Sequence, residues 1–357
     1  MNDKIFAPQF HTTAQLKSSL EDIERNQWLI ERVLIMPKHE AWVRRDVAVR
    51  RATGTTRIEG AALDQRQVAE LARRTQPAKL SEDEAANVNA LETYEWIDYL
   101  SGQQDIPMDE FVIREINRHF LRGASEMLTP GVYRKGQNHI GSFLPPDQGD
   151  VPDLMRAFGL WLRQEPGDLN PVSRAAIAHL HFVAIHPFWD GNGRTARGLA
   201  TLILQRSRFS FHKLLSLEYR FYERREAYQS VIAGAVGTRF SLTYDATPFV
   251  EFFAAELAGH VQDLVNSLTD WHRRIAELHG RLEREHAGLN PRQIDGLIYA
   301  LQTGELRPAD YKEITKASDV TCSRDLAGLV KAGLLAAEGR TRGRVYKVVR
   351  SQGKQRT

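Results

Sequence analysis

Residues 186 to 197, HPFWDGNGRTAR, gather several side chains that could handle a phosphorylated substrate. His186 titrates near neutral pH and could take a proton from a hydroxyl group. Gly191 and Gly193 permit a tight turn that brings backbone N–H groups close to a ligand. The helix expected to follow has unpaired N–H groups and a dipole at its start, and both favour phosphate. The segment therefore indicates phosphate binding beside a candidate base.

Two arginines, an amide and an acid complete this segment. Arg194 and Arg197 are three residues apart, so both lie on one helical face, where their forked cations suit phosphate oxygens. Asn192 adds a neutral donor. Asp190 would repel a phosphate unless a cation bridges them, and Mg²⁺ is the usual ion. Each residue alone has a structural explanation, as a turn or a solvated face, but the combination favours a phosphate-binding site.

The same segment resembles the Fic motif, HxFx(D/E)GNGRxxR, at every specified position. The resemblance covers about residues 90 to 260. GVYRKGQNHIGSFLPP resembles the flap of Fic domains, and SLEYRFYERREAY resembles the segment after the motif. This resemblance implies a nucleotidyltransferase that moves AMP from ATP to a hydroxyl group of a target protein and releases pyrophosphate.

The resemblance also implies a role for each motif residue. His186 would be the general base that activates a Tyr, Ser or Thr hydroxyl, and Asp190 would hold Mg²⁺ on the phosphates. The phosphates themselves would be bound by Gly191, Asn192, Gly193, Arg194 and Arg197. Family members that phosphorylate their targets tend to carry Lys in place of the second glycine, so Gly193 favours AMP transfer. Three tyrosines are candidates for the nucleobase pocket, although aromatic residues in helices are more often core: Tyr219, Tyr222 and Tyr228.

A second pattern of this family, (S/T)xxxE(G/N), matches TTRIEG at residues 55–60. In the family it marks an inhibitory helix, here on the N-terminal side of the Fic region. Thr55 and Glu59 are four residues apart on one helical face, and Gly60 could end that helix. We expect Glu59 to pair with Arg197 and so keep it from the γ-phosphate. A further hypothesis is that Glu59 positions a water molecule that removes AMP from a modified target.

The elements that must position these residues are mainly helices. Residues 131–146 carry Gly, Asn and Pro around short apolar pieces, which predicts a β-hairpin or an ordered loop. The first helix is expected to bury one face, consisting of Leu16, Leu20, Ile23, Trp28 and Leu29. Ser81 is a candidate N-cap for a later helix.

These patterns predict a mainly α fold: a Fic helical bundle with a short β-hairpin flap, followed by a C-terminal winged helix-turn-helix domain. The expected regions are an N-terminal helical region at 1–88 with the inhibitory helix at about 55–60, a Fic domain at 89–262, a connecting helix and linker at 263–289, and the winged helix-turn-helix domain at 290–350.

The C-terminal region is basic. From Asn290 onward 13 Lys or Arg residues face 7 Asp or Glu residues, a net charge of +6. Three residues would lie at the exposed start of its third helix, Thr321, Ser323 and Arg324, and four basic residues would lie on the wing, Arg340, Arg342, Arg344 and Lys347. Such residues suit DNA phosphates, so DNA is a candidate partner. The alternative is a module for protein interaction or dimerisation, and a homodimer is also a candidate.

The overall composition is that of an ordinary soluble globular protein, with 42% hydrophobic and 26% charged residues among 357. We expect no membrane span and no secretory signal. The single cysteine, Cys322, fits a reducing cytoplasm and excludes a cysteine-based zinc cluster. The main prediction is an autoinhibited protein adenylyltransferase that modifies a target protein and itself. The alternative is a DNA-binding regulator whose Fic domain senses nucleotide or uses a different nucleotide donor.

Overall fold

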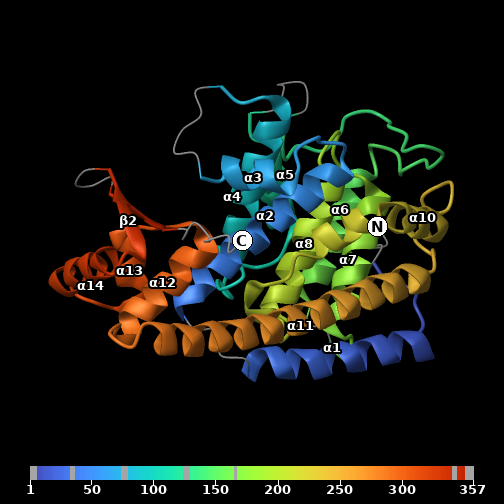
Figure 1. Cartoon of the computed structure of the whole chain (residues 1–357). Coiled ribbons are helices and arrows are strands. Elements are labelled where there is room, and N and C mark those ends of the chain that lie inside the picture. The colour runs from blue at the N-terminus through green and yellow to red at the C-terminus, as the bar shows by residue number, and fades with distance from the viewer. Residues whose placement is uncertain are drawn as a thin grey trace, which may run out of the picture. The chain divides into compact units, whose positions relative to one another are not determined.

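The computed structural model describes residues 6–32, 37–73, 79–123, 129–164, 167–339 and 344–349. These residues are mainly helical, and the strands form one small sheet near the C-terminus (Figure 1). The predicted mainly α fold is therefore confirmed. Within these ranges, the helices lack the combination of length and apolar character that crossing a membrane requires.

The chain divides into two compact units. The first takes Met1–Arg32 and Val43–Leu264, and the second takes Val33–Trp42 and Val265–Thr357. In this division the N-terminal helices share a unit with the Fic region, and most of the segment predicted as a connector falls in the second unit.

Two antiparallel neighbours, α7 (Pro171–Ile185) and α8 (Asn192–Arg206), form the centre of the first unit, and most residues of both are buried. Around them pack α4 (Glu82–Leu100) and α5 (Glu110–Phe120). The other helices that contribute to this unit are α1 (Ala14–Arg32), α2 (Pro37–Ile58), α3 (Gln65–Leu71), α6 (Val151–Arg163), η2 (Phe211–Lys213), α9 (Leu217–Glu223), α10 (Arg225–Val236) and the start of α11 (Thr247–Glu285). The loop between α7 and α8 is thus anchored at both ends in buried helices.

Local sequence explains where α4 begins. The hydroxyl of Ser81 accepts the N–H of Glu84 at 3.2 Å, and the Glu84 carboxylate accepts the N–H of Ser81 at 3.0 Å. This reciprocal capping box satisfies two N–H groups that the helix cannot pair internally. Ser81 is therefore the N-cap, as its position before three acidic residues predicts.

The first helix, α1, buries a face that differs in part from the predicted one. Leu16, Ile23 and Ile30 are buried, and their seven-residue spacing keeps them on one side. Trp28 is 54% exposed and Leu29 is 36% exposed, so neither side chain belongs to the core. The Arg32 guanidinium covers the Trp28 ring, 3.9 Å from its centroid, which shields an aromatic surface without burying it.

Residues 131–146, predicted as a β-hairpin, form a loop with one antiparallel bridge, between Ile140 and Phe143. Of the two predicted alternatives, the segment is thus the ordered loop, and the β-hairpin flap is reduced to this single bridge. After Phe143 and Leu144, Pro145 and Pro146 have no N–H group, so a ladder cannot continue through them.

Contacts with the rest of the first unit hold this loop instead. Leu144 donates its N–H to the carbonyl of Thr238 at 2.9 Å. Arg134 donates its backbone N–H to the carbonyl of Pro187 at 2.9 Å and its Nε to the carbonyl of His186 at 3.0 Å. The loop is therefore fastened directly to the start of the α7–α8 connection.

The second unit contains the rest of α11 and a small mixed domain. Its elements are α12 (Pro291–Thr303), β1 (Glu305–Leu306), α13 (Pro308–Thr315), α14 (Asp319–Lys331), β2 (Leu335–Glu338) and β3 (Val345–Val348). The sheet order is β1-β3-β2, with both pairs antiparallel. Its core includes Ile275 and Leu282 from α11. The three helices and the C-terminal hairpin appear in the predicted order, but β1, between α12 and α13, was not predicted. The assignment to the winged helix-turn-helix class stays a prediction.

A buried carboxylate ties the helices of this domain together. Asp325 on α14 accepts hydrogen bonds from Asn290 at 3.1 Å, Arg292 at 2.9 Å and the Tyr311 hydroxyl at 3.0 Å. These donors and the Arg292 cation outweigh burial and lower the pKa of Asp325. Of the basic residues expected on the wing, Arg340 and Arg342 lie outside the described residues.

Candidate active site

His186 ends α7 with its backbone in the left-handed region, at φ 49°, and the next residue, Pro187, cannot continue the helix. Its Nδ1 lies 3.3 Å from the carbonyl oxygen of Val183, which can only accept, so Nδ1 carries the proton. Nε2 is then left as the proton acceptor. Burial, above all, lowers the pKa of His186 to about 4. The imidazole is therefore neutral at pH 7, as a general base must be.

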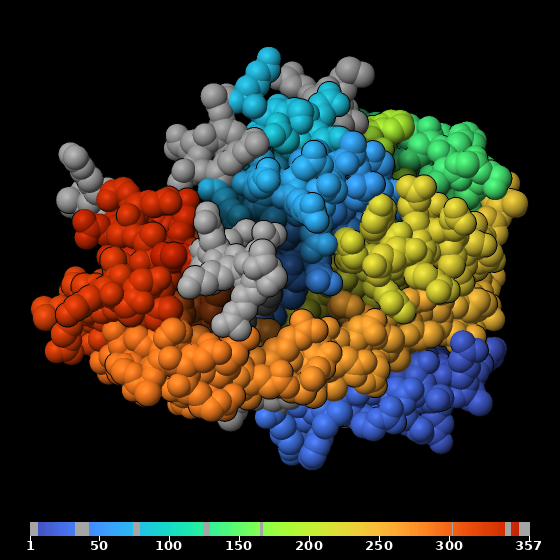
Figure 2. Space-filling view, in the orientation of Figure 1, coloured from blue at the N-terminus to red at the C-terminus, as the bar shows by residue number. Residues whose placement is uncertain are grey.

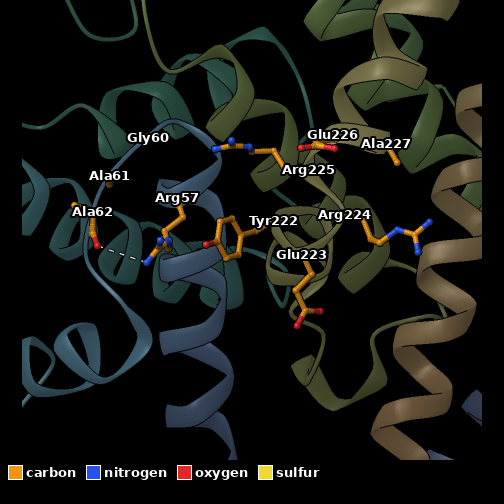
Figure 3. Close-up of a pocket in the computed structure, with 10 residues that line it drawn as sticks. All are labelled: Arg57, Gly60, Ala61, Ala62, Tyr222, Glu223, Arg224, Arg225, Glu226 and Ala227. Carbon is orange, nitrogen blue, oxygen red and sulfur yellow. Dashed lines mark hydrogen bonds between the residues drawn. The ribbon is translucent and has the colours of Figure 1, made fainter.

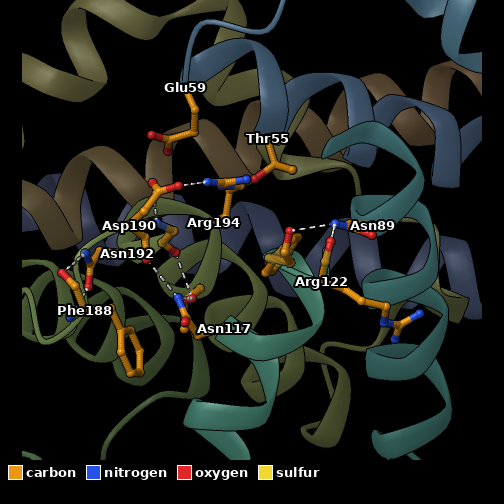
Figure 4. A network of polar contacts seen from close by, with 12 residues as sticks. Thr55, Glu59, Asn89, Asn117, Arg122, Phe188, Asp190, Asn192 and Arg194 are labelled. Carbon is orange, nitrogen blue, oxygen red and sulfur yellow. Dashed lines mark hydrogen bonds and ion pairs between the residues drawn. The ribbon is translucent and has the colours of Figure 1, made fainter. Parts of the chain in front are cut away.

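The side chain of Asn192 holds the loop after His186 in place, whereas the sequence predicted that it would bind phosphate. The side chain of Asn192 accepts the N–H of Phe188 at 3.0 Å and donates to its carbonyl at 2.8 Å (Figure 4). This paired contact fixes the loop conformation. The contribution of Asn192 to phosphate binding can then come from its backbone N–H in the first turn of α8.

Gly191 caps α8 with a φ of 75°, a conformation that strains residues with a side chain. A Cβ atom there would lie 2.9 Å from Nδ2 of Asn117. The N–H of Gly191 donates to Oδ1 of Asp190 at 2.6 Å. This glycine is required both by its backbone conformation and by the close approach of α5.

Asp190 and Arg194 form an ion pair, with Oδ2 and Nη2 2.9 Å apart (Figure 4). The Asp190 side chain is still 43% exposed, so it can meet an incoming cation. Arg194 is largely buried, and its Nε has no acceptor among the described residues. A buried donor without an acceptor is costly, and a phosphate oxygen would satisfy it.

Arg197 is buried and is held by the end of α2. Its Nε donates to the Thr55 hydroxyl at 2.9 Å, and Nη2 donates to the Thr55 carbonyl at 3.1 Å. Nη2 also lies 2.6 Å from Oε1 of Glu59, so the contact expected between Glu59 and Arg197 is present. α2 ends at Ile58, and Gly60, at φ 102°, turns the chain away directly afterwards.

The charge of Arg197 depends on its neighbours. Burial alone would lower its pKa, but Tyr228 and Glu59 beside the guanidinium raise the pKa above its usual range. The group is thus a permanent cation in a buried position. Withdrawal of Glu59 would leave a buried positive charge without its anion, which is costly unless another anion binds there.

Sequence reasoning missed Asn117, which joins three parts of the site. This buried residue of α5 donates from Nδ2 to the Asp190 carbonyl at 3.0 Å and accepts the Gly131 N–H at 2.8 Å. It therefore connects the motif loop to the loop at 131–146. A signal was available, because Asn117 lies on the same helical face as the buried Ile113 and Phe120. A polar residue on an apolar face requires a partner.

The three tyrosines proposed for the nucleobase pocket lie in different surroundings. Tyr228 is buried in the core, whereas Tyr219 is half-buried. Tyr222 lines an open cavity of about 790 Å³ between the end of α2 and the start of α10 (Figure 3). The guanidinium of Arg57 lies 5.1 Å from the Tyr222 ring centroid and donates to the Ala62 carbonyl. On the face shown in Figure 2, the blue end of α2 borders the yellow α9–α10 surface at this cavity.

The described residues contain no cluster of three or more His, Cys, Asp or Glu side chains that could enclose a metal ion. The Asp190 side chain is 43% exposed. One carboxylate is compatible with a metal that arrives with its substrate, because Mg²⁺ commonly binds one or two carboxylates plus phosphate oxygens. A metal role for Asp190 stays a prediction.

Residues 107–204 match the model of the Fic/DOC family, and this segment of the chain is a Fic domain. A protein named "Protein adenylyltransferase Fic" from Nematostella vectensis is 33% identical over 183 residues, 50% of this chain and 39% of that protein. The protein of the same name from Drosophila mojavensis is 43% identical over 96 residues, 27% of this chain and 19% of that protein. The chain thus spans less than half the length of these relatives.

A solved structure is similar over nearly the whole chain. The crystal structure of a Fic family protein from Desulfovibrio desulfuricans G20 has a TM-score of 0.65 and 24% sequence identity, with 98% of this chain and 100% of that chain covered. This likeness shows a shared fold.

Proposed function

We propose that the protein is an autoinhibited adenylyltransferase that transfers AMP from ATP to a Tyr, Ser or Thr hydroxyl of a target protein and of itself. The observation that carries this proposal is the position of His186, whose Nε2 is free to accept a proton at the loop that opens α8. The Fic domain and the names of the similar proteins support the same reaction class.

In the proposed reaction, the target hydroxyl oxygen attacks the α-phosphorus of ATP. His186 takes the hydroxyl proton on Nε2 while the bond from the α-phosphorus to the β-phosphate oxygen breaks. Pyrophosphate leaves, and AMP remains as a phosphodiester on the target. Positioning and charge neutralisation supply most of the rate in such a transfer.

The start of α8 would bind the phosphates through the backbone N–H groups of Asn192 and Gly193, and through that of Gly191 once it leaves the Asp190 carboxylate. Arg194 would donate its unpaired Nε, and Arg197 would meet the γ-phosphate. Asp190 would hold Mg²⁺, which, when bound, lowers the negative charge on the phosphates. For that purpose the Asp190 carboxylate must exchange Arg194 for the cation, which its exposure allows.

The proposed inhibition follows from the contact between Glu59 and Arg197. With Oε1 of Glu59 2.6 Å from Nη2, a carboxylate takes the place of a γ-phosphate oxygen. ATP that binds without this arginine would have its α-phosphate out of line with the attacking hydroxyl. Glu59 is 37% exposed, whereas Arg197 is buried, so the carboxylate is the mobile partner of the pair.

The test is transfer of labelled nucleotide by wild type, Glu59→Gly and Glu59→Gly/His186→Ala, alone and in a cell lysate. We expect about ten- to hundredfold more incorporation by Glu59→Gly, because a charge-assisted contact of this kind is worth about 1.5–3 kcal/mol. His186→Ala should abolish it. ATP, GTP, CTP and UTP are compared side by side. ATP binding without incorporation by Glu59→Gly would support the alternative, a nucleotide sensor.

We propose, too, that Glu59 serves the reverse removal of AMP. A water molecule would attack the phosphorus of the AMP–target bond and pass its proton to Glu59. The target oxygen would leave and take up a proton from solvent, delivered through Nε2 of His186, while Glu59 returns the proton of the water molecule to solvent. Incubation of AMPylated target with wild type and with Glu59→Gly tests this step, because only the wild type should release AMP.

A second proposal concerns the C-terminal unit, which we propose binds duplex DNA through α14. Ser323 and Arg324 of α14 face solvent while Cys322 points inward, and Arg344 before β3 is also exposed. An electrophoretic shift with random DNA should weaken steeply from low to high salt. Arg324→Glu should weaken it further, unlike Arg281→Glu on the exposed side of α11. Equal binding by both variants would contradict a role for α14.

A further inference from the structure

Two buried residues next to Arg197, Tyr228 and His179, have no role in the proposed reaction. The hydroxyl of Tyr228, on α10, is 3.4 Å from Nη1 of Arg197 and 2.8 Å from Nε2 of His179, on α7. All three side chains are buried. They form a row of polar groups that leads from the centre of the unit to the candidate phosphate site.

The direction of these hydrogen bonds follows from the chemistry of the groups. A guanidinium only donates, so the Tyr228 oxygen accepts from Arg197 and its own proton must go to His179. Nε2 of His179 is then unprotonated, which places the proton on Nδ1. Burial, with a smaller effect from Arg197, lowers the pKa of His179 to about 3, so the ring is neutral. The chain of donation runs from Arg197 through Tyr228 to His179.

This arrangement leaves a buried donor unsatisfied. Nδ1 of His179 has no hydrogen-bond partner among the described residues. The ring is packed against Phe249, with centroids 5.1 Å apart and planes at 19°, and an apolar side chain could fill this space without the unpaired group. The free-energy cost of leaving Nδ1 unpaired is explained if Nε2, on the other side of the ring, is needed to accept the proton of the Tyr228 hydroxyl.

The row has a particular place among the contacts of Arg197. The other hydrogen bonds that the described structure gives this guanidinium all come from the end of α2, from Thr55 and Glu59. Tyr228 is the partner that belongs to another helix. When the end of α2 moves away, the Tyr228 contact is therefore the one that can persist.

We propose that Tyr228, oriented by His179, is a positioning residue that keeps Arg197 aimed into the phosphate site after Glu59 withdraws. The inference rests on the proposed function, because it needs Arg197 to bind the γ-phosphate. The pair presets the guanidinium, so that ATP does not have to order it. Arg197 then stays in place in both states. It binds Glu59 in the inhibited state and the γ-phosphate of ATP in the active state.

The hydroxyl of Tyr228 can be removed while its ring packing is kept. The ring stacks on Phe221, with centroids 4.7 Å apart and planes at 14°, and Phe at position 228 would preserve this contact. A matched control exists in the same unit. Tyr244 also bonds a buried histidine, His181, at 2.9 Å, but this pair does not contact Arg197.

The experiment measures the dissociation constants of AMP and of a non-hydrolysable ATP analogue by calorimetry, with every variant built on Glu59→Gly. We expect Tyr228→Phe to weaken binding of the analogue about five- to tenfold and to leave AMP, which lacks the γ-phosphate, within about twofold. Tyr244→Phe should change neither. His179→Gln, which keeps an acceptor, should lose less analogue affinity than His179→Leu.

Two results would overturn the inference. One is an equal loss for AMP and the analogue with Tyr228→Phe, which would show a general structural effect. The other is the same loss with Tyr244→Phe. Arg197→Ala separates this failure from that of the proposed function: if it leaves the preference for the analogue over AMP unchanged, Arg197 does not bind the γ-phosphate at all.

Discussion

The carboxylate of Glu59 fills the space that a side chain on Gly193 would need. A Cβ atom at Gly193 would lie 2.4 Å from Oε1 of Glu59 and 3.0 Å from Nη1 of Arg197. The contact between Glu59 and Arg197 therefore depends on a glycine in the first turn of α8. Glu59 and the motif residues at the start of α8 are in close contact at this position.

Gly193→Ala should push Glu59 away from Arg197, because the carboxylate is the end of a flexible side chain and can yield. We expect the substitution to lower the free energy of unfolding by about 1–3 kcal/mol in the wild type and by less than half of that in Glu59→Gly. Urea titrations of the four proteins measure this coupling.

Gly234→Ala is the matched control, because Gly234 lies inside α10 with open space around its Cβ position. There alanine should be neutral or stabilising by up to about 1 kcal/mol. If Gly193→Ala costs the same in both backgrounds, the conflict is with Arg197 or the backbone and not with Glu59.

Asn117 and Asn89 allow the connection between α5 and the site to be tested. Asn117→Ala leaves the buried Gly131 N–H and the Asp190 carbonyl without their partner, which should cost about 2–3 kcal/mol. The motif loop then loses its fixed position, and transfer by the Glu59→Gly protein should fall about tenfold or more. Labelled AMP incorporation measures the loss.

Asn89 bonds the carbonyls at the end of the same helix, with 2.8 Å to Arg122, but does not reach the motif (Figure 4). Asn89→Ala should cost about 1 kcal/mol of stability and leave transfer unchanged. A similar fall in transfer for both variants would mean that α5 acts only through overall stability.

The pH dependence of transfer should reflect the low pKa of His186. Burial lowers this pKa to about 4, so the base stays unprotonated down to mildly acidic pH. The turnover number of Glu59→Gly at saturating nucleotide should therefore be flat from pH 8 to about 5.5 and fall only as the pH approaches 4. An inflection near 6.5, the ordinary value for histidine, would contradict this role of burial.

The sequence allowed prediction of the parts of the site that are local or that follow from the family resemblance. The residues of the motif share one loop and one helix turn, and the expected contact of Glu59 with Arg197 is present. The roles of these residues stay predictions. Asn117 was missed, and Tyr228 was a candidate only for the nucleobase pocket, so its contacts with Arg197 and His179 were not predicted. The partners of both residues lie far along the chain, and only the folding of α5 and α10 against the motif brings them together.

Two other differences have the same origin. Trp28 has the spacing of a core residue, but α1 buries the helical face that carries Leu16, Ile23 and Ile30. The loop at 131–146 has the composition of a hairpin, yet its backbone groups find partners in the α7–α8 connection and near residue 238. The composition of a segment indicates which of its residues can be buried or hydrogen-bonded. Their actual partners depend on the helices packed around the segment.

Buried histidines should make the first unit sensitive to acid. Burial lowers the pKa of His260 to about 4, and the pKa values of His179 and His181 to about 3. In the unfolded chain these groups take up protons below about pH 6.5, whereas the folded protein does not until the lower values are reached. Stability is therefore lost as the pH falls from about 6.5 toward 4, by up to about 1.4 kcal/mol per pH unit for each histidine.

His260→Gln isolates one share of this effect. A glutamine oxygen can replace Nε2, which accepts the N–H of Ser216 at 3.0 Å, so the fold should be kept. The slope of unfolding free energy against pH between 6 and 5, from urea titrations, should become shallower by up to about 1.4 kcal/mol per unit. An unaltered slope for His260→Gln would mean that this histidine takes up its proton in the folded protein as readily as in the unfolded chain.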